Sequence, residues 1–153
     1  MPSRIPRAAA VAALALGLGA CTLHPVGPAR TDDAYEGKAV TTAEAGLSAV
    51  ETVRLAAQAA DHGSFGPYLS VLVSDQEESL TGVQGTFASV QPPSERSDDL
   101  RAELDDLLST ALEHVVAVRV ATRRGDLDAL LATATPLQQD ADALEAFVEE
   151  HGG

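Results

Sequence analysis

Several residue types are scarce in this chain of 153 residues, which contains one cysteine, no tryptophan, two tyrosines and three phenylalanines. A single cysteine cannot close an internal disulfide. So few aromatic rings provide no stacking surface for sugars or nucleic-acid bases. Disulfide-rich folds and sites that bind carbohydrates or stack bases are therefore disfavoured.

Basic residues are also few, since ten lysines and arginines face 23 aspartates and glutamates and give a formal net charge of −13. A chain this acidic lacks the basic surface that binds nucleic-acid phosphates or anionic lipid headgroups. We therefore expect no nucleic-acid partner and no electrostatic attachment of the folded domain to a membrane.

The first twenty residues have the organisation of a signal peptide. Arg4 and Arg7 give a positively charged start, and an apolar stretch rich in small residues follows from Ala8 to Ala20. A helix of this stretch would be about 20 Å long, which is shorter than the ~30 Å hydrocarbon core of a bilayer. We expect residues 1–20 to be a signal peptide and not a permanent anchor.

The one cysteine, Cys21, follows this stretch directly and closes the run Leu18-Gly19-Ala20-Cys21. The run is similar to the lipobox of bacterial lipoproteins. That resemblance implies that diacylglycerol is attached to the thiol of Cys21, that the chain is cut between Ala20 and Cys21, and that the new N-terminus can then be acylated. Two acyl chains suffice for stable anchoring. The resemblance implies a lipid-anchored protein on the extracytoplasmic face of the cell membrane. An ordinary secretory signal that ends near a cysteine is the alternative.

Removal of residues 1–20 would leave 133 residues with a formal net charge of −15, because eight basic and all 23 acidic residues remain. This length suits one compact domain. Residues 21–38 contain Pro25, Pro28 and two glycines, with few apolar residues and no periodicity. Such a composition predicts a flexible tether between the membrane and a domain formed by residues 39–153.

Apolar residues recur at steps of three and four in this domain, which is typical of amphipathic helices. The clearest stripe comprises Leu127, Leu130, Ala134, Leu137, Ala141, Leu144 and Val148. Helices are predicted at about 41–61, 66–90, 96–124 and 127–150. Because no strand-like alternation is present, the sequence predicts an all-α fold, an up-down-up-down four-helix bundle.

Two features are expected to interrupt these helices. Pro136 should kink the last helix or divide it with Thr135 as a new cap, because proline lacks a backbone N–H. Gly82 and Gly85 each weaken the second helix by up to about 1 kcal/mol relative to alanine. We expect a local break or a close helix approach near these glycines.

Metal, cofactor and catalytic motifs are absent from the sequence. The Glu-x-x-His pattern of ferritin-like bundles does not occur. The three histidines of the domain, His62, His114 and His151, fall at different heights of an up-down bundle and cannot share one ion. The acidic pairs lack the spacing of a calcium loop, and no nucleophile motif or phosphate-binding glycine loop is present. We expect no metal, no cofactor and no enzymatic activity.

Two polar residues are candidates for a small pocket. Gln76 lies within the apolar stripe of the second helix, and His114 lies beside that of the third, next to Glu113. A structural side chain with a satisfied hydrogen bond is the simpler interpretation of each. The leading hypothesis is a lipid-anchored, non-enzymatic interaction or envelope-accessory module with an envelope protein as partner. The alternatives are a bundle that binds a small ligand near Gln76 and His114, and an enzyme that uses His114 with Glu113 or another carboxylate.

Overall fold

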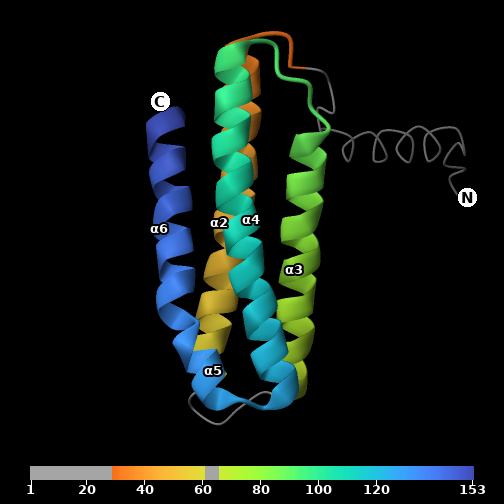
Figure 1. Cartoon of the computed structure of the whole chain (residues 1–153), viewed down its shortest axis with the longest axis vertical. Coiled ribbons are helices and arrows are strands. Elements are labelled where there is room, and N and C mark those ends of the chain that lie inside the picture. Colours follow the sequence, from red (N-terminus) through yellow and green to blue (C-terminus); the bar gives the residue numbers. More distant parts are fainter. Residues whose placement is uncertain (1–28, 61–65) are drawn as a thin grey trace, which may run out of the picture.

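The structure, a computed structural model, describes residues 29–60 and 66–153, and all of its regular elements in these ranges are helices. The elements are α2 (Asp32–Ala60), α3 (Gly66–Ala88), α4 (Glu95–Arg124), α5 (Leu127–Ala132) and α6 (Ala134–His151). Three long helices and the α5–α6 pair alternate in direction, as Figure 1 shows. The predicted all-α, up-down-up-down bundle is confirmed.

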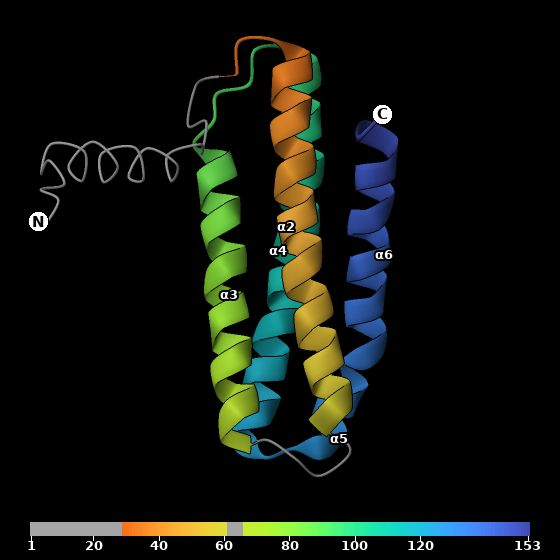
Figure 2. The ribbon, with the colours of Figure 1, turned by 180° about the vertical axis from the view of Figure 1, so that it is seen from behind.

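Two helices form the centre of the bundle. α2 and α4 contact each other, and each also contacts α3 and α6. α3 and α6 lie on opposite sides of this central pair and do not contact one another (Figures 1 and 2). We call the end where α2 and α4 begin and α6 finishes the upper end. The end where α2 finishes, α3 begins and α5 lies is the lower end, as drawn in Figure 1.

The core between these helices is continuous and mainly aliphatic. Leu104, Leu108 and Val115 are fully buried on one face of α4. α2 faces them with small residues, and the closest approach is at Gly46, where an added Cβ atom would come within 2.6 Å of Cδ2 of Leu108. The small face of α2 therefore allows α4 to pack closely against it.

Local sequence signals set the ends of α4. Ser94 is the N-cap, and its Oγ accepts the N–H of Ser97 at 3.3 Å. Gly125 follows the last turn with a φ of 65°, a left-handed conformation that glycine adopts at little cost. The predicted range of about 96–124 is confirmed to within one residue, and α3 and α6 end within two residues of their predicted ends.

The predicted tether is wrong for residues 32–38, because these residues form the first turns of α2. Oγ1 of Thr31 accepts the N–H of Ala34 at 3.2 Å and caps this start. Tyr35 and Ala39, four positions apart, are fully buried and extend the apolar face of α2 toward its N-terminus. Residues 21–28 of the predicted tether lie outside the described residues.

The last helix is divided, but not at the predicted residue. α5 and α6 meet at Thr133 and not at Thr135. Thr133 is buried, and its hydroxyl donates to the carbonyl of Leu130 at 2.6 Å. Pro136 is then the third residue of α6, where the missing N–H removes no bond within the helix. The break therefore lies far enough before Pro136 for the proline to fit in a first turn.

The glycines of α3 correct a further expectation, since they neither break the helix nor bring another helix close. α3 is continuous through Gly82 and Gly85, and a Cβ atom at either position would meet nothing within 4 Å. Both glycines are exposed, whereas Leu80 and Phe87 are buried on another face of the helix. The packing of that buried face outweighs the weak helix propensity of glycine.

Candidate functional site

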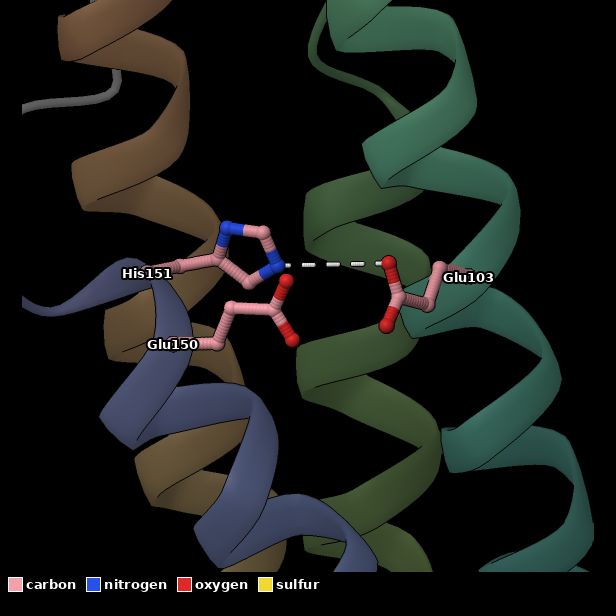
Figure 3. A group of neighbouring side chains, drawn as sticks. All are labelled: Glu103, Glu150 and His151. Carbon is pink, nitrogen blue, oxygen red and sulfur yellow. Dashed lines mark ion pairs between the residues drawn. The ribbon is translucent and has the colours of Figure 1, made fainter.

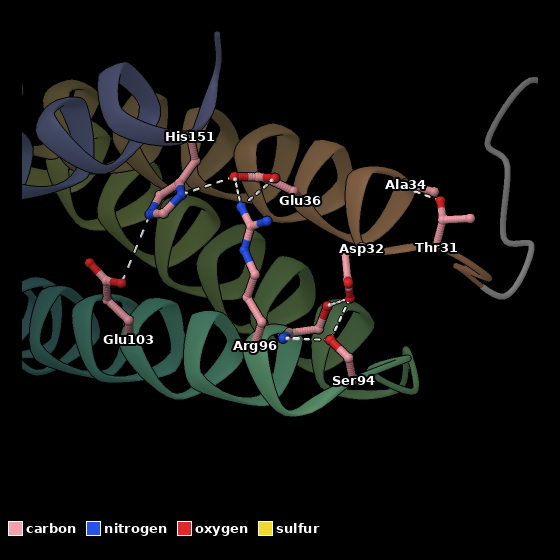
Figure 4. Close-up of polar contacts among 9 residues, drawn as sticks. Thr31, Asp32, Ala34, Glu36, Ser94, Arg96, Glu103 and His151 are labelled. Carbon is pink, nitrogen blue, oxygen red and sulfur yellow. Dashed lines mark hydrogen bonds and ion pairs between the residues drawn. The ribbon is translucent and has the colours of Figure 1, made fainter.

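A network of polar side chains joins α2, α4 and α6 at the upper end (Figure 4). Oδ1 of Asp32, at the start of α2, accepts hydrogen bonds from the hydroxyls of Ser94 at 2.5 Å and Ser97 at 2.7 Å. These hydrogen bonds lower the pKa of Asp32 below its ordinary value of 3.8. The first turn of α2 is thereby fastened to the first turn of α4.

Glu36 lies one turn further along α2 and contacts the other two helices. Its carboxylate is 3.3 Å from the guanidinium of Arg96 on α4 and 3.2 Å from Nδ1 of His151 on α6. Because an ionised carboxylate only accepts hydrogen bonds, Nδ1 of His151 carries the proton in this contact. In a neutral imidazole the lone pair is then on Nε2.

Nε2 of His151 faces two further carboxylates (Figure 3). Ligand atoms of Glu103 on α4 and of Glu150 and His151 on α6 all lie within 4.8 Å of one another. Nε2 of His151 is 3.9 Å from Oε2 of Glu103, which is too long for a hydrogen bond. This nitrogen is buried and has no hydrogen-bond partner in the described part of the chain. One imidazole and two carboxylates are a donor set that divalent transition metals accept.

The sequence did not predict this cluster. Glu36 and His151 are 115 positions apart, and no local motif joins them. They meet because α6 returns antiparallel to α2 and finishes beside its start. The adjacent Glu150 and His151, at the end of a predicted amphipathic helix, were the one available signal.

His114 pairs with a carboxylate that the sequence did not single out. Its Nδ1 is 2.7 Å from Oδ2 of Asp140 on α6, whose side chain is only 5% exposed. Burial raises the pKa of Asp140 above its ordinary value of 3.8, and the hydrogen bond from His114 opposes that rise. Glu113, the neighbour considered for an enzyme, is exposed. His114 therefore has the structural hydrogen bond of the simpler interpretation.

The structure does not bring Gln76 and His114 together. Gln76 is half-buried on α3, whereas His114 faces α6, and α3 and α6 do not contact each other. Neither residue lines either of the two grooves described next. The pocket predicted near these two side chains has no counterpart in those grooves.

Two grooves lie on the surface between neighbouring helices. One, between α3 and α4, has a volume of about 480 Å³ and contains the ion pair of Glu77 with Arg119. The other, which we call the apolar groove, lies between α2 and α3 near the lower end and has a volume of about 320 Å³. It is lined by Thr52, Leu55, Ala56, Ala59, Tyr68, Leu69 and Leu72. The two grooves therefore differ in polarity.

Large exposed apolar side chains gather at the lower end. Within residues 29–60 and 66–153, the exposed large hydrophobic side chains are between 41% and 64% exposed. They are Leu55, Tyr68, Val71, Leu127 and Leu131. They belong to the end of α2, the start of α3 and α5, which Figure 1 places at the lower end. The upper end instead carries the charged network of Figure 4. The large exposed apolar side chains and the polar network of Figure 4 thus lie at opposite ends of the bundle, and the lower end also carries exposed charges at Arg123, Arg124, Asp126 and Asp128.

The predicted lipidation and cleavage residues, Cys21 and Ala20, lie outside the described residues, as does His62. Across the two described ranges, no helix is both long and apolar enough to cross a bilayer. Comparison with known proteins found no match among protein-family models, curated proteins or solved structures.

Proposed function

We propose that the protein is a lipid-anchored, non-enzymatic interaction module of the bacterial cell envelope, which presents its lower end to a protein partner. The observation that carries this proposal is the group of large exposed apolar side chains at the end opposite the start of α2. α2 starts at the upper end, eleven positions after Cys21 of the lipobox. The large exposed apolar side chains lie at the opposite end. An anchored bundle of this kind keeps its apolar end available for protein contacts.

The length of α2 sets the distance between the anchor and the proposed docking surface, which consists of the apolar groove and the exposed apolar side chains of the lower end. Its 29 residues, at ~1.5 Å each, span about 43 Å. Leu55 lies 23 positions beyond Asp32, which corresponds to about 35 Å along the helix axis. A partner at the apolar groove would therefore be met well away from the start of α2.

The apolar groove suits a protein surface that presents apolar side chains among basic ones. Leu55 and Tyr68 line it and are 56% and 64% exposed, and tyrosine is a frequent anchor of protein interfaces. Asp75, which is exposed, stands one helical turn beyond Val71. Together with the net charge of −15 after processing, it favours a basic partner. A second copy of this acidic chain would be repelled.

Capture of the partner from detergent-solubilised native envelope tests the docking surface. The bait is the full lipoprotein, as wild type, as Leu55→Gln, as Val71→Gln and as the control Ala102→Gln, which changes an exposed residue of α4 near the upper end. Exposed substitutions alter the free energy of unfolding by less than about 0.5 kcal/mol, so all four should fold. We expect at least about tenfold less partner on Leu55→Gln, which changes the apolar groove, and on Val71→Gln, which changes the exposed apolar surface beside it. Equal recovery on all four baits would contradict the proposal.

The lipid anchor has its own test. Cys21→Ala removes the thiol that the lipobox resemblance implies is lipidated, whereas Thr22→Ala leaves that thiol in place. We expect Cys21→Ala to leave the membrane fraction and Thr22→Ala to stay in it. A Cys21→Ala protein that sediments with the membranes would contradict anchoring through this residue.

A further inference from the structure

We propose that Glu103, Glu150 and His151 form a binding site for a divalent transition metal ion, and that Zn²⁺ is the ion their donor atoms fit best. The site lies at the upper end of the bundle and is independent of the docking function proposed for the lower end. Its three ligand atoms come from two helices and lie within 4.8 Å of one another (Figure 3). Imidazole and carboxylate are both common ligands of Zn²⁺.

His151 is already oriented as a metal ligand. The carboxylate of Glu36 holds its Nδ1–H at 3.2 Å, which fixes the tautomer and directs the Nε2 lone pair toward Glu103 (Figure 4). A histidine that binds a metal usually donates its other N–H to a carboxylate or carbonyl in this way. Glu36 is in turn held by Arg96, so the support of the imidazole continues into α4.

Nε2 of His151 points toward Glu103 from an imidazole that is 16% exposed, and the two groups form an ion pair when the imidazole is protonated. This atom is buried and has no hydrogen-bond partner among the residues that the structure describes. Its distance of 3.9 Å to Oε2 of Glu103 is too long for a hydrogen bond. Two ligands of a tetrahedral zinc ion, each bonded at about 2.0 to 2.1 Å, lie about 3.3 Å apart. The Glu103 side chain is 52% exposed, so a small rotation brings its oxygen to that distance.

The local charge also suits a divalent cation. Glu36, Glu103 and Glu150 contribute three negative charges, and Arg96 contributes one positive charge, which leaves a net charge of −2 for a neutral imidazole. The site is at the C-terminal end of α6, where the helix dipole attracts cations. Because Ca²⁺ and Mg²⁺ prefer oxygen-only ligand sets, the imidazole favours a transition metal over either. A bound ion would fasten the end of α6 to α4, with one coordination position left for water.

The test is calorimetric titration of ZnCl₂ into the full lipoprotein in detergent after removal of metals with a chelator. The variants are Glu103→Gln and His151→Ala, with Glu36→Gln for the positioning residue and Glu145→Gln, an exposed residue of α6, as control. We expect a loss of affinity of about 100-fold for the first two, about 10- to 100-fold for Glu36→Gln, and none for Glu145→Gln. Circular dichroism identifies any variant that fails to fold, and the exposed Glu103 makes Glu103→Gln the one that tests the site without that risk.

Cobalt provides a second readout. Co²⁺ added to the wild type should give visible absorption bands of a site with nitrogen and oxygen ligands, and His151→Ala should lose them. Zinc affinity of Glu103→Gln equal to that of Glu145→Gln would overturn the proposal. So would wild-type binding of Mg²⁺ as tightly as Zn²⁺, since an imidazole site discriminates between these ions.

Discussion

Nδ1 of His114 lies 2.7 Å from Oδ2 of Asp140, and this contact joins α4 to α6. The carboxylate is 5% exposed and the imidazole 35% exposed, so the two partners differ in their access to water. Asp140 is among the few buried polar residues of the described chain. A buried carboxylate is tolerated only where a hydrogen-bond donor compensates for lost water, and His114 is that donor.

Loss of His114 should therefore cost more stability than loss of Asp140. We expect His114→Ala to lower the free energy of unfolding by about 1 to 3 kcal/mol, because it leaves a buried acceptor without its partner. Asp140→Ala leaves only an imidazole that already reaches solvent. Urea denaturation of both variants measures the difference. A smaller effect for His114→Ala than for Asp140→Ala would contradict this assignment.

Stability should also depend on pH through Asp140. Burial raises its pKa in the folded state above 3.8, so the folded protein holds this proton more tightly than the unfolded chain does. The resulting stabilisation is fully present below the unfolded pKa and is lost as the pH rises through the raised pKa. We expect Asp140→Asn to gain stability relative to wild type as the pH rises above about 4. Urea denaturation of both proteins at several pH values from about 4 upward measures this difference. A rise in the stability of the wild type relative to Asp140→Asn over this range would contradict the prediction.

The glycines should respond in opposite directions to alanine. At Gly46 the new methyl group would come within 2.6 Å of Cδ2 of Leu108, which is fully buried and has little room to move. Such overpacking costs about 1 to 3 kcal/mol, which exceeds the gain in helix propensity. At Gly82 nothing lies within 4 Å, so alanine should stabilise α3 by about 0.5 to 1 kcal/mol. Thermal unfolding of the two variants tests this, and stabilisation by Gly46→Ala would show that α4 is not packed against α2 as described.

The start of α2 should depend on Asp32. Asp32→Ala removes the hydrogen bonds to Ser94 and Ser97, whereas Asp33→Ala removes an exposed acid from the same turn. We expect several-fold faster amide exchange over residues 35–39 in the first variant and a smaller change in the second, because both lose charge near the helix start but only one loses the link to α4. Equal exchange in the two variants would mean that the serines do not hold this turn.

The sequence predicted the elements of the fold well wherever apolar spacing and caps agreed. Around α4 both signals were present, and the observed ends of α4 agree with the predicted ends to within one residue. At the start of α2 the signals conflicted. Gly37 and the nearby prolines indicated coil, whereas Tyr35 and Ala39 are buried through contacts with other helices. The cap at Thr31 and the four-residue spacing of Tyr35 and Ala39 are local signals for this boundary, and burial against other helices outweighs the weak helix propensity of Gly37.

The candidate metal centre could not be predicted from the sequence for a related reason. A motif search finds ligands that are close in sequence, but Glu103 and His151 come from α4 and the far end of α6. His114 was noticed because it borders an apolar stripe, yet its partner Asp140 follows only from how α4 and α6 face each other. Composition and periodicity determine which faces are buried, and the pairing of helices determines which polar groups meet.

Photo-crosslinking in living cells of the native host tests directly whether the apolar groove contacts a protein partner. A photoreactive amino acid is placed at Leu55, in the apolar groove, or at Ala102, exposed near the upper end, in a chain that keeps Cys21. We expect a crosslink from Leu55 to one envelope protein that does not form from Ala102. Identical products from both positions, or a crosslink from Leu55 only to a second copy of this chain, would contradict this expectation.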